Sequence, residues 1–249
     1  MTAIGLEFDQ AGIAATIAGV AARQHLPRQA VTIAYAAALQ ESKLQNLDYG
    51  DLDSVGVFQQ RPSQGWGTTA EIENPVYATT RFFAALARVH GYATMPVAQA
   101  AQDVQHSADG YAYGQWAQVA TLLAGYFTGS HPAGVSCWYS PGAQADLAGA
   151  LKLATSTFGS AGKGRVLVAI STERSAGKNS AGKNNDGTVA VVRVQRDAAW
   201  TVASWLVAYA QQYGISQLRY ASYAWTAADG SAGWQAAAQS PNRGSIVAG

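Results

Sequence analysis

Glu41 is the residue whose type and position point most directly to chemistry. It ends a helix that the alanine-rich segment 28–41 predicts, and small apolar residues share its face: Ala34, Ala37 and Ala38. This apolar face and the negative end of the helix dipole both disfavour an ionised carboxylate. A carboxylic acid that keeps its proton is what a glycosidase needs to protonate a leaving oxygen. The alternative is that Glu41 caps the following loop or pairs with Lys43.

A motif of fixed spacing follows this carboxyl. Ser42 comes next, and three further motif residues fall 15, 18 and 21 positions after Glu41: Gly56, Gln59 and Pro62. The pattern resembles the lytic transglycosylase and goose-type lysozyme superfamily, whose motif is Glu-Ser followed by Gly-x-x-Gln-x-x-Pro. The resemblance covers residues 8–127. It implies an all-α lysozyme-like domain in which Glu41 is the general acid and then the base, with no cofactor and no metal.

Two runs carry a closer similarity. Gln-Glu-Ser-Lys-Leu-Gln-Asn-Leu-Asp at 40–48 and Phe-Gln-Gln-Arg-Pro-Ser-Gln-Gly-Trp-Gly at 58–67 resemble exported actinobacterial cell-wall proteins of this superfamily. Those proteins join an N-terminal lysozyme-like domain to a small C-terminal α+β domain, and a membrane anchor usually precedes them. The resemblance therefore implies an extracellular or cell-wall location, membrane anchorage in the full-length protein, and a chain trimmed at its N-terminus.

A second carboxylate would decide the mechanism. Asp51 and Asp53 lie in the segment after Glu41, where goose-type lysozymes place acidic residues, and either could activate water in an inverting hydrolase with ~6.5–9.5 Å between the carboxyls. Lytic transglycosylases lack that base; the acetamido group of their substrate assists, which leaves a 1,6-anhydro product. The alternative is that the aspartates cap turns of the loop, so hydrolase and transglycosylase both stay open.

Further residues are candidates for holding a glycan. Ser42 and Gln59 belong to the motif, Tyr49 and Trp66 are aromatic residues with glycine neighbours, and Gln105 could line the cleft. Transglycosylases usually carry a Tyr-Asn-Ala-Gly-like motif whose tyrosine faces the acid. This chain departs from that motif and offers Tyr111 or Tyr113 as the phenol, without a basis for choosing between them.

Composition excludes several classes of protein. The chain has 249 residues, of which 49% are hydrophobic and 12% charged, with a net charge of +1. Disorder is excluded by the apolar content, and the small net charge argues against nucleic-acid binding. One cysteine and four scattered histidines offer no metal-ligand spacing. The apolar run 11–22 is too short to span a bilayer, so no membrane segment is expected in this chain.

Charge divides the chain into two parts. Residues 1–129 carry 6 Lys+Arg and 10 Asp+Glu, whereas residues 130–249 carry 10 and 5. The sign changes at a small-residue stretch that contains Pro132. We therefore predict a lysozyme-like domain at 1–129, a linker at 130–140 and a small α+β domain of unknown role at 141–249.

The periodicity of apolar residues predicts the elements. In the first part, helices are expected after Asp9, over 28–41, after Asn74-Pro75, after Pro96, and through Trp116 to Phe127, with a long polar segment at 42–73. In the second part, strands are expected at 165–171, 189–194, 218–223 and 245–247, with a helix capped by Asp197. The sheet should be mainly antiparallel, which gives an α+β two-domain chain.

These observations predict an enzyme that cleaves glycan strands of peptidoglycan at the MurNAc-β-1,4-GlcNAc bond. The alternative is a catalytically weak lysozyme-like protein that binds glycan or assists secretion or conjugation in the cell wall. A third reading is an enzyme whose C-terminal domain docks on a cell-wall or secretion-system protein. No nucleic-acid partner is expected.

Overall fold

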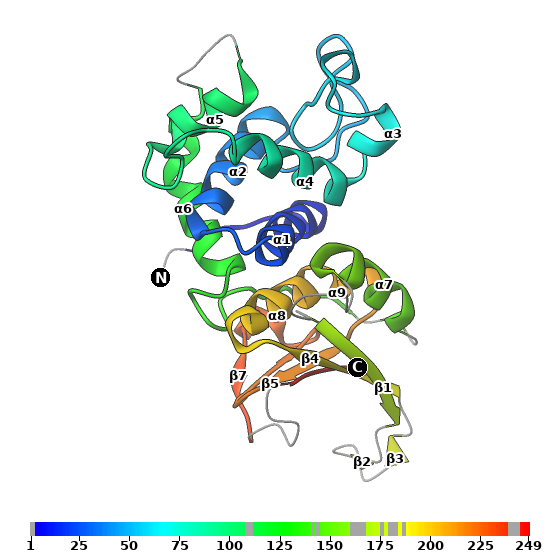
Figure 1. The fold of residues 1–249 in the computed structure, drawn as a ribbon. Coiled ribbons are helices and arrows are strands. Elements are labelled where there is room, and N and C mark those ends of the chain that lie inside the picture. The colour runs from blue at the N-terminus through cyan, green and yellow to red at the C-terminus, as the bar shows by residue number, and fades with distance from the viewer. Residues whose placement is uncertain are drawn as a thin grey trace. The chain divides into compact units, whose positions relative to one another are not determined.

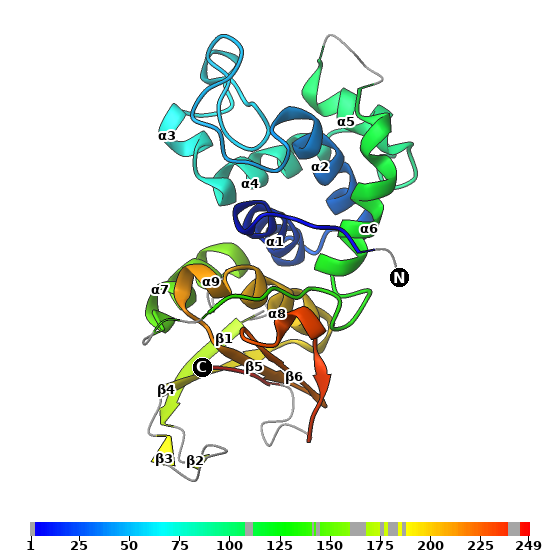
Figure 2. The same cartoon turned by 180° about the vertical axis from the view of Figure 1, so that it is seen from behind.

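The computed structural model describes residues 3–107, 112–140, 142, 145–159, 168–174, 177–178, 184–185, 188–238 and 245–249. The chain divides into two compact units, Met1–Ser130 and His131–Gly249, which we call unit 1 and unit 2. Figure 1 and Figure 2 show that the described part of unit 1 is helical, whereas unit 2 joins helices to a sheet. The prediction of an α+β chain with a helical first part is confirmed.

Unit 1 is built around one alanine-rich helix, α2. The α-helices of unit 1 are α1 (Phe8–Arg23), α2 (Arg28–Glu41), α3 (Thr69–Ile72), α4 (Pro75–Leu86), α5 (Val97–Gln105) and α6 (Ala117–Phe127), joined by 3₁₀ turns η1 (Pro62–Gln64) and η2 (Gly114–Trp116). Every residue of α2 from Ala30 to Leu39 is buried, and α2 contacts α1, α4, α5 and α6. Small side chains permit this close packing, so the C-terminal end of α2 rests on a closely packed core.

The helix starts follow local chemistry. Asn74 caps α4, because its Oδ1 accepts hydrogen bonds from the backbone nitrogens of Val76 and Tyr77 at 3.0 and 3.3 Å. At α1 the predicted cap is wrong by two residues. Glu7 is the capping residue, and its backbone nitrogen donates to Oε1 of Gln10 at 2.9 Å.

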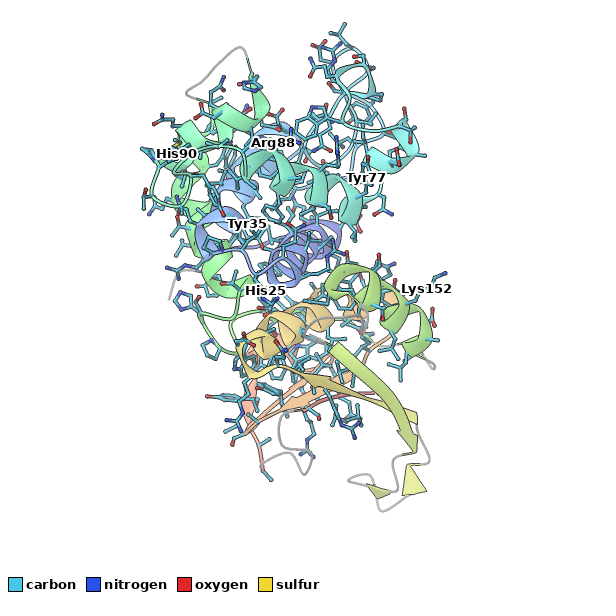
Figure 3. The ribbon with its side chains drawn as sticks, viewed as in Figure 1. His25, Tyr35, Tyr77, Arg88, His90 and Lys152 are labelled. Carbon is cyan, nitrogen blue, oxygen red and sulfur yellow. The ribbon has the colours of Figure 1, made fainter. Side chains whose placement is uncertain are left out.

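Part of the long segment 42–73 packs into the core of unit 1. Leu44, Val57 and Phe58 are fully buried, and the Phe58 ring stacks on Phe82 of α4 with 4.5 Å between ring centroids. Tyr35, labelled in the interior of unit 1 in Figure 3, donates a hydrogen bond to the Ala14 carbonyl at 2.7 Å. The segment that follows Glu41 is therefore fixed by the same core that surrounds α2.

Unit 2 places helices on one face of an antiparallel sheet (Figures 1 and 2). Its α-helices are α7 (Leu147–Phe158), α8 (Ala199–Ala208) and α9 (Ala210–Tyr213), with 3₁₀ turns η3 (Arg196–Ala198) and η4 (Gly230–Ala232). The sheet has the order β1-β4-β8-β5-β6-β7, formed by Val168–Arg174, Thr188–Val194, Ser245–Ala248, Gln217–Tyr220, Tyr223–Thr226 and Gln235–Ala236. A separate pair joins β2 (Gly177–Lys178) to β3 (Asn184–Asn185).

Two expectations for unit 2 are wrong in detail, and one helix was not expected. The single strand predicted at 218–223 is a hairpin of β5 and β6, because the chain reverses at Ala221, whose φ is 52°. Alanine rarely adopts that conformation, so the sequence carries no turn signal there. Asp197 lies within η3 instead of capping a helix. The helix α7 was not expected; Asp146 caps it by accepting from the backbone nitrogen of Gly149 at 2.8 Å.

The predicted linker 130–140 is part of unit 2 over most of its length. We call residues 131–139 the strap. The Trp225 indole nitrogen donates to the Cys137 carbonyl at 3.1 Å, the Trp234 indole nitrogen donates to the Val135 carbonyl at 2.9 Å, and Ser136 Oγ donates to the Gly230 carbonyl at 2.6 Å. These bonds tie residues 135–137 of the strap to unit 2.

Cys137 is a structural residue of the strap. Its thiol donates to the Val207 carbonyl with 3.2 Å between sulfur and oxygen, and burial raises the pKa of Cys137 to about 12. The thiolate is the nucleophilic form of cysteine. A protonated, half-buried thiol is therefore unsuited to nucleophilic catalysis.

Candidate active site

Glu41 is the last residue of α2, and Ser42 fixes the chain that leaves it. The Ser42 side chain is buried, its Oγ donates to the Val57 carbonyl at 2.7 Å, and it accepts from the backbone nitrogen of Gln45 at 3.2 Å. The bond to Val57 joins the end of α2 to residues 55–60, which we call the motif loop. Ser42 thus holds the loop that follows Glu41, and only 3% of the residue is exposed.

Tyr113 meets Glu41 directly. Its phenol donates to Oε1 of Glu41 at 2.6 Å, and its side chain is fully buried. Among the described residues, Oε2 of Glu41 has no hydrogen-bond partner. Tyr111, the other tyrosine that the sequence offers for this role, lies outside the described residues. The geometry holds one carboxyl oxygen and leaves the second available for proton transfer.

The motif loop is a tight turn closed by a bridge between Val55 and Gln60. Gly56 has a φ of 78°, and a Cβ on it would lie 2.7 Å from the Ile72 carbonyl oxygen, so only glycine fits without displacement. The Gln59 side chain donates to the Tyr49 carbonyl at 3.2 Å and to the Gly56 carbonyl at 3.3 Å. Gln59 therefore braces the loop from within, and its Oε1 lies against Gly50, where a Cβ would overlap with it.

Gln105 ties the loop to α5. Its Nε2 donates to the Phe58 carbonyl at 2.8 Å. Since Gln105 ends α5 and Phe58 precedes Gln59, this bond connects the helix before Tyr113 with the loop after Glu41. The sequence suggests that Gln105 lines a cleft. In the structure the Gln105 side chain holds the backbone of the motif loop.

The two glycine-flanked aromatic residues differ in exposure. Tyr49 is 68% exposed, as a stacking surface for a sugar ring requires. Trp66 is half-buried, and its carbonyl accepts from Tyr77 Oη at 3.3 Å and from Arg81 Nε at 3.2 Å. Tyr77 is labelled at α4 in Figure 3. The Trp66 backbone is thus fixed on α4.

Asp53 is committed to an ion pair. Its Oδ1 lies 2.7 Å from Nε of Arg61, and its Oδ2 accepts from the backbone nitrogen of Ser63 at 2.8 Å. Arg61 first, and Ser63 next, lower the pKa of Asp53 to about 2. A carboxylate of such low basicity is a poor general base. Asp51 is exposed, and its carboxylate is in no ion pair within the described part of the chain.

The Asp53→Asn variant should lose a pH-dependent part of the stability of unit 1. Because folding depresses this pKa from its usual 3.8 to about 2, the ionised carboxylate stabilises the fold above pH 3.8 and ceases to do so as the pH falls toward 2. Thermal unfolding should give wild type the higher Tm at neutral pH, with a difference that shrinks below about pH 4. Asp51→Asn is the matched control and should follow wild type. A Tm difference independent of pH would contradict the assignment.

Three residues around Glu41 were not recognised as site residues from the sequence. Trp116 donates from its indole nitrogen to Oε1 of Gln40 at 2.8 Å. The Lys43 ammonium lies over the Trp116 ring, 4.4 Å from its centroid. Within the described residues Lys43 forms no ion pair with Glu41, so the expected alternative of a Glu41–Lys43 pair is wrong. The signal in the sequence was only the adjacency of Gln40 and Lys43 to Glu41.

Metal-binding clusters and membrane-spanning helices were sought among the described residues. No group of three or more His, Cys, Asp or Glu side chains there could hold a metal ion. His25 and His90 are labelled at separate places in unit 1 in Figure 3. The helices of the described part include none that is long and apolar enough to cross a membrane.

No family model fits the chain, and no curated protein is significantly similar to it. The assignment of a function therefore rests on the geometry around Glu41 and on the motif that surrounds it.

Proposed function

We propose that the protein cleaves the glycan strands of peptidoglycan at the MurNAc-β-1,4-GlcNAc bond, with Glu41 as general acid and then as base. The observation that carries this proposal is the 2.6 Å hydrogen bond from Tyr113 to Oε1 of Glu41. It fixes one carboxyl oxygen at the end of a buried helix, and no described residue bonds to Oε2, which is the arrangement that proton transfer to a glycosidic oxygen needs.

The reaction uses this carboxyl twice. Glu41 donates its proton to the glycosidic oxygen as the bond from that oxygen to the anomeric carbon breaks, and the carboxylate then removes a proton in the second step. In a lytic transglycosylase the acetamido group of the substrate assists, the C6 hydroxyl of the sugar attacks the anomeric carbon to close the 1,6-anhydro ring, and the proton of that hydroxyl goes to Glu41. In the alternative, an inverting hydrolase, Glu41 acts once as the acid, and Asp51 takes a proton from the water that attacks the anomeric carbon.

The loop aspartates favour the transglycosylase route. Both oxygens of Asp53 are occupied by Arg61 and Ser63, and its lowered pKa leaves a weak base. Asp51 stays the candidate base for the hydrolase route. We therefore propose a lytic transglycosylase, with hydrolysis through Asp51 as the alternative.

Substrate contacts come from the rim of the site. The exposed ring of Tyr49 is the proposed stacking surface for a sugar, and its backbone is held by Gln59. Gln59, Gln105 and Trp66 support the walls of the loop around it. A peptidoglycan substrate places the enzyme at the cell wall, where the resemblance to exported cell-wall proteins also points.

Digestion of purified peptidoglycan, with the products weighed by mass spectrometry, tests the proposal. Fragments with 1,6-anhydro ends would support the transglycosylase. Fragments with reducing ends, which are one water heavier, would identify a hydrolase and support Asp51 as its general base. No release from walls that a control lysozyme digests would reject the enzyme and leave a lysozyme-like glycan-binding or secretion-assembly protein.

Tyr113→Phe should reduce the rate of glycan release by about tenfold, because the variant keeps the buried ring but loses one hydrogen bond to Glu41, worth ~1–2 kcal/mol. Initial rates on soluble glycan strands measure the effect. Tyr92→Phe, at a tyrosine whose hydroxyl has no hydrogen-bond partner in the described structure, is the control. An unchanged rate in Tyr113→Phe would remove Tyr113 from the site.

A further inference from the structure

We infer that Lys43, held on the Trp116 ring, is an anion-binding subsite beside Glu41 that takes a carboxylate of the substrate. For a peptidoglycan substrate this carboxylate belongs to the stem peptide on the muramyl sugar next to the scissile bond. The inference rests on the proposed function and adds a basis for selectivity between charged and uncharged strands.

The position of Lys43 is fixed at both ends of the residue. Its backbone has a φ of 58°, and its carbonyl accepts from Nε2 of Gln10 at 2.8 Å. Its ammonium rests over the Trp116 ring, 4.4 Å from the centroid. A lysine held in this way has already lost much of the rotamer freedom that a mobile surface lysine gives up on binding.

The Trp116 ring under Lys43 belongs to the candidate active site. Tyr113 and Trp116 are three residues apart at the 3₁₀ turn η2, and residues with that spacing lie on the same side of such a turn. Tyr113 reaches Glu41, and Trp116 reaches Gln40, the residue before Glu41. The turn η2 therefore helps to position both the Glu41 carboxyl and the Lys43 ammonium.

The charge of Lys43 is not used within the described structure. No carboxylate there pairs with it, although residues 1–129 carry 10 acidic against 6 basic residues. A cation–π contact engages one side of the ammonium, and the side chain is exposed. The remaining N–H groups are available to an anion. Since no described side chain supplies an anion at that place, we assign it to the ligand.

Stem peptides supply such anions, because each free peptide terminus carries a carboxylate. Strands in which these carboxylates are converted to amides keep nearly the same shape but lose the charge. The pair of substrates therefore separates the charge of the ligand from its size, which a comparison with an unrelated polymer would not do.

The experiment compares soluble peptidoglycan strands with the same strands after carbodiimide-driven amidation of their carboxylates. Cleavage rates and equilibrium binding are measured on the full chain for wild type, Lys43→Gln and Lys43→Arg. Arg88→Gln is the control for charge, since Arg88 is an exposed cation on the same unit, labelled in Figure 3.

We expect Lys43→Gln to lower kcat/KM on untreated strands about three- to tenfold and to change it less than twofold on amidated strands. Lys43→Arg should keep the wild-type preference for untreated strands, and Arg88→Gln should change neither rate. The preference should weaken as salt rises.

Equal losses on both substrates, or no wild-type preference for untreated strands, would overturn the inference while leaving the proposed function intact. If wild type cleaves neither substrate, the proposed function fails, and binding decides about Lys43. Tighter binding of untreated strands that Lys43→Gln abolishes would uphold the subsite. Equal binding of both strands by wild type would reject it.

Discussion

Glu41→Gln is expected to lower the rate of glycan release by about 10²–10⁴-fold, the usual contribution of a general acid. The amide has nearly the same shape as the carboxylic acid, and its oxygen can still accept the hydrogen bond from Tyr113. It cannot donate an acidic proton to the glycosidic oxygen, nor take a proton in the second step. Release of soluble fragments from purified walls, followed over time, measures the loss.

The matched control is Asp103→Asn. Asp103 is an exposed carboxylate on α5 with no ion pair in the described structure, so its removal changes the charge equally and should leave the rate unchanged. Circular dichroism should show both variants folded. Wild-type rates in Glu41→Gln, with wild type active, would show that another group supplies the proton.

Phe58→Ala is expected to destabilise unit 1 by about 3–5 kcal/mol, as truncation of a fully buried aromatic side chain typically does. Phe58 is completely buried and stacks on Phe82 with an interplanar angle of 17°. Loss of the ring leaves a cavity beneath the turn that carries Gln59. Urea unfolding, with the transition of unit 1 followed separately from that of unit 2, measures the change.

Leu52→Ala is the control for Phe58→Ala. Leu52 lies in the same segment but is 75% exposed, so its truncation should change the stability by less than about 0.5 kcal/mol. If Phe58→Ala is equally mild, the loop is not supported by the core, and the rigid site described above needs revision.

The sequence predicts the elements well where a pattern is local. The helix over 28–41 is confirmed at both ends: it starts after Pro27, is rich in alanine from residue 30 to residue 38, and stops where Ser42 turns the chain. Asn74-Pro75 is a cap followed by proline, and it opens α4 as predicted. The packing of segment 42–73 could not be predicted, since the partners of its buried residues lie on distant elements such as α4.

The candidate site likewise contains residues that the sequence predicts and residues whose roles depend on contacts between distant segments. Glu41 and Gln59 are candidates because of the family motif that the sequence resembles, but the choice of Tyr113 depends on the turn η2, which no periodicity of the sequence predicts. The contact between Lys43 and Trp116 joins residues far apart in the chain, so nothing in the local sequence of either could reveal it. The pairing of Asp53 with Arg61 is local, eight residues apart, yet a carboxylate that caps and one that catalyses have the same sequence signature.

The strap has a consequence for how the two units can be separated. Trp225 and Trp234 each donate an indole hydrogen bond to a backbone carbonyl of the strap. A fragment that starts at residue 141 would therefore lack the hydrogen-bond acceptors of both tryptophans. A fragment that starts at His131 keeps both. Any gene rearrangement or recombinant truncation that transfers unit 2 intact must therefore bring along a stretch whose proline and small residues look like dispensable spacer.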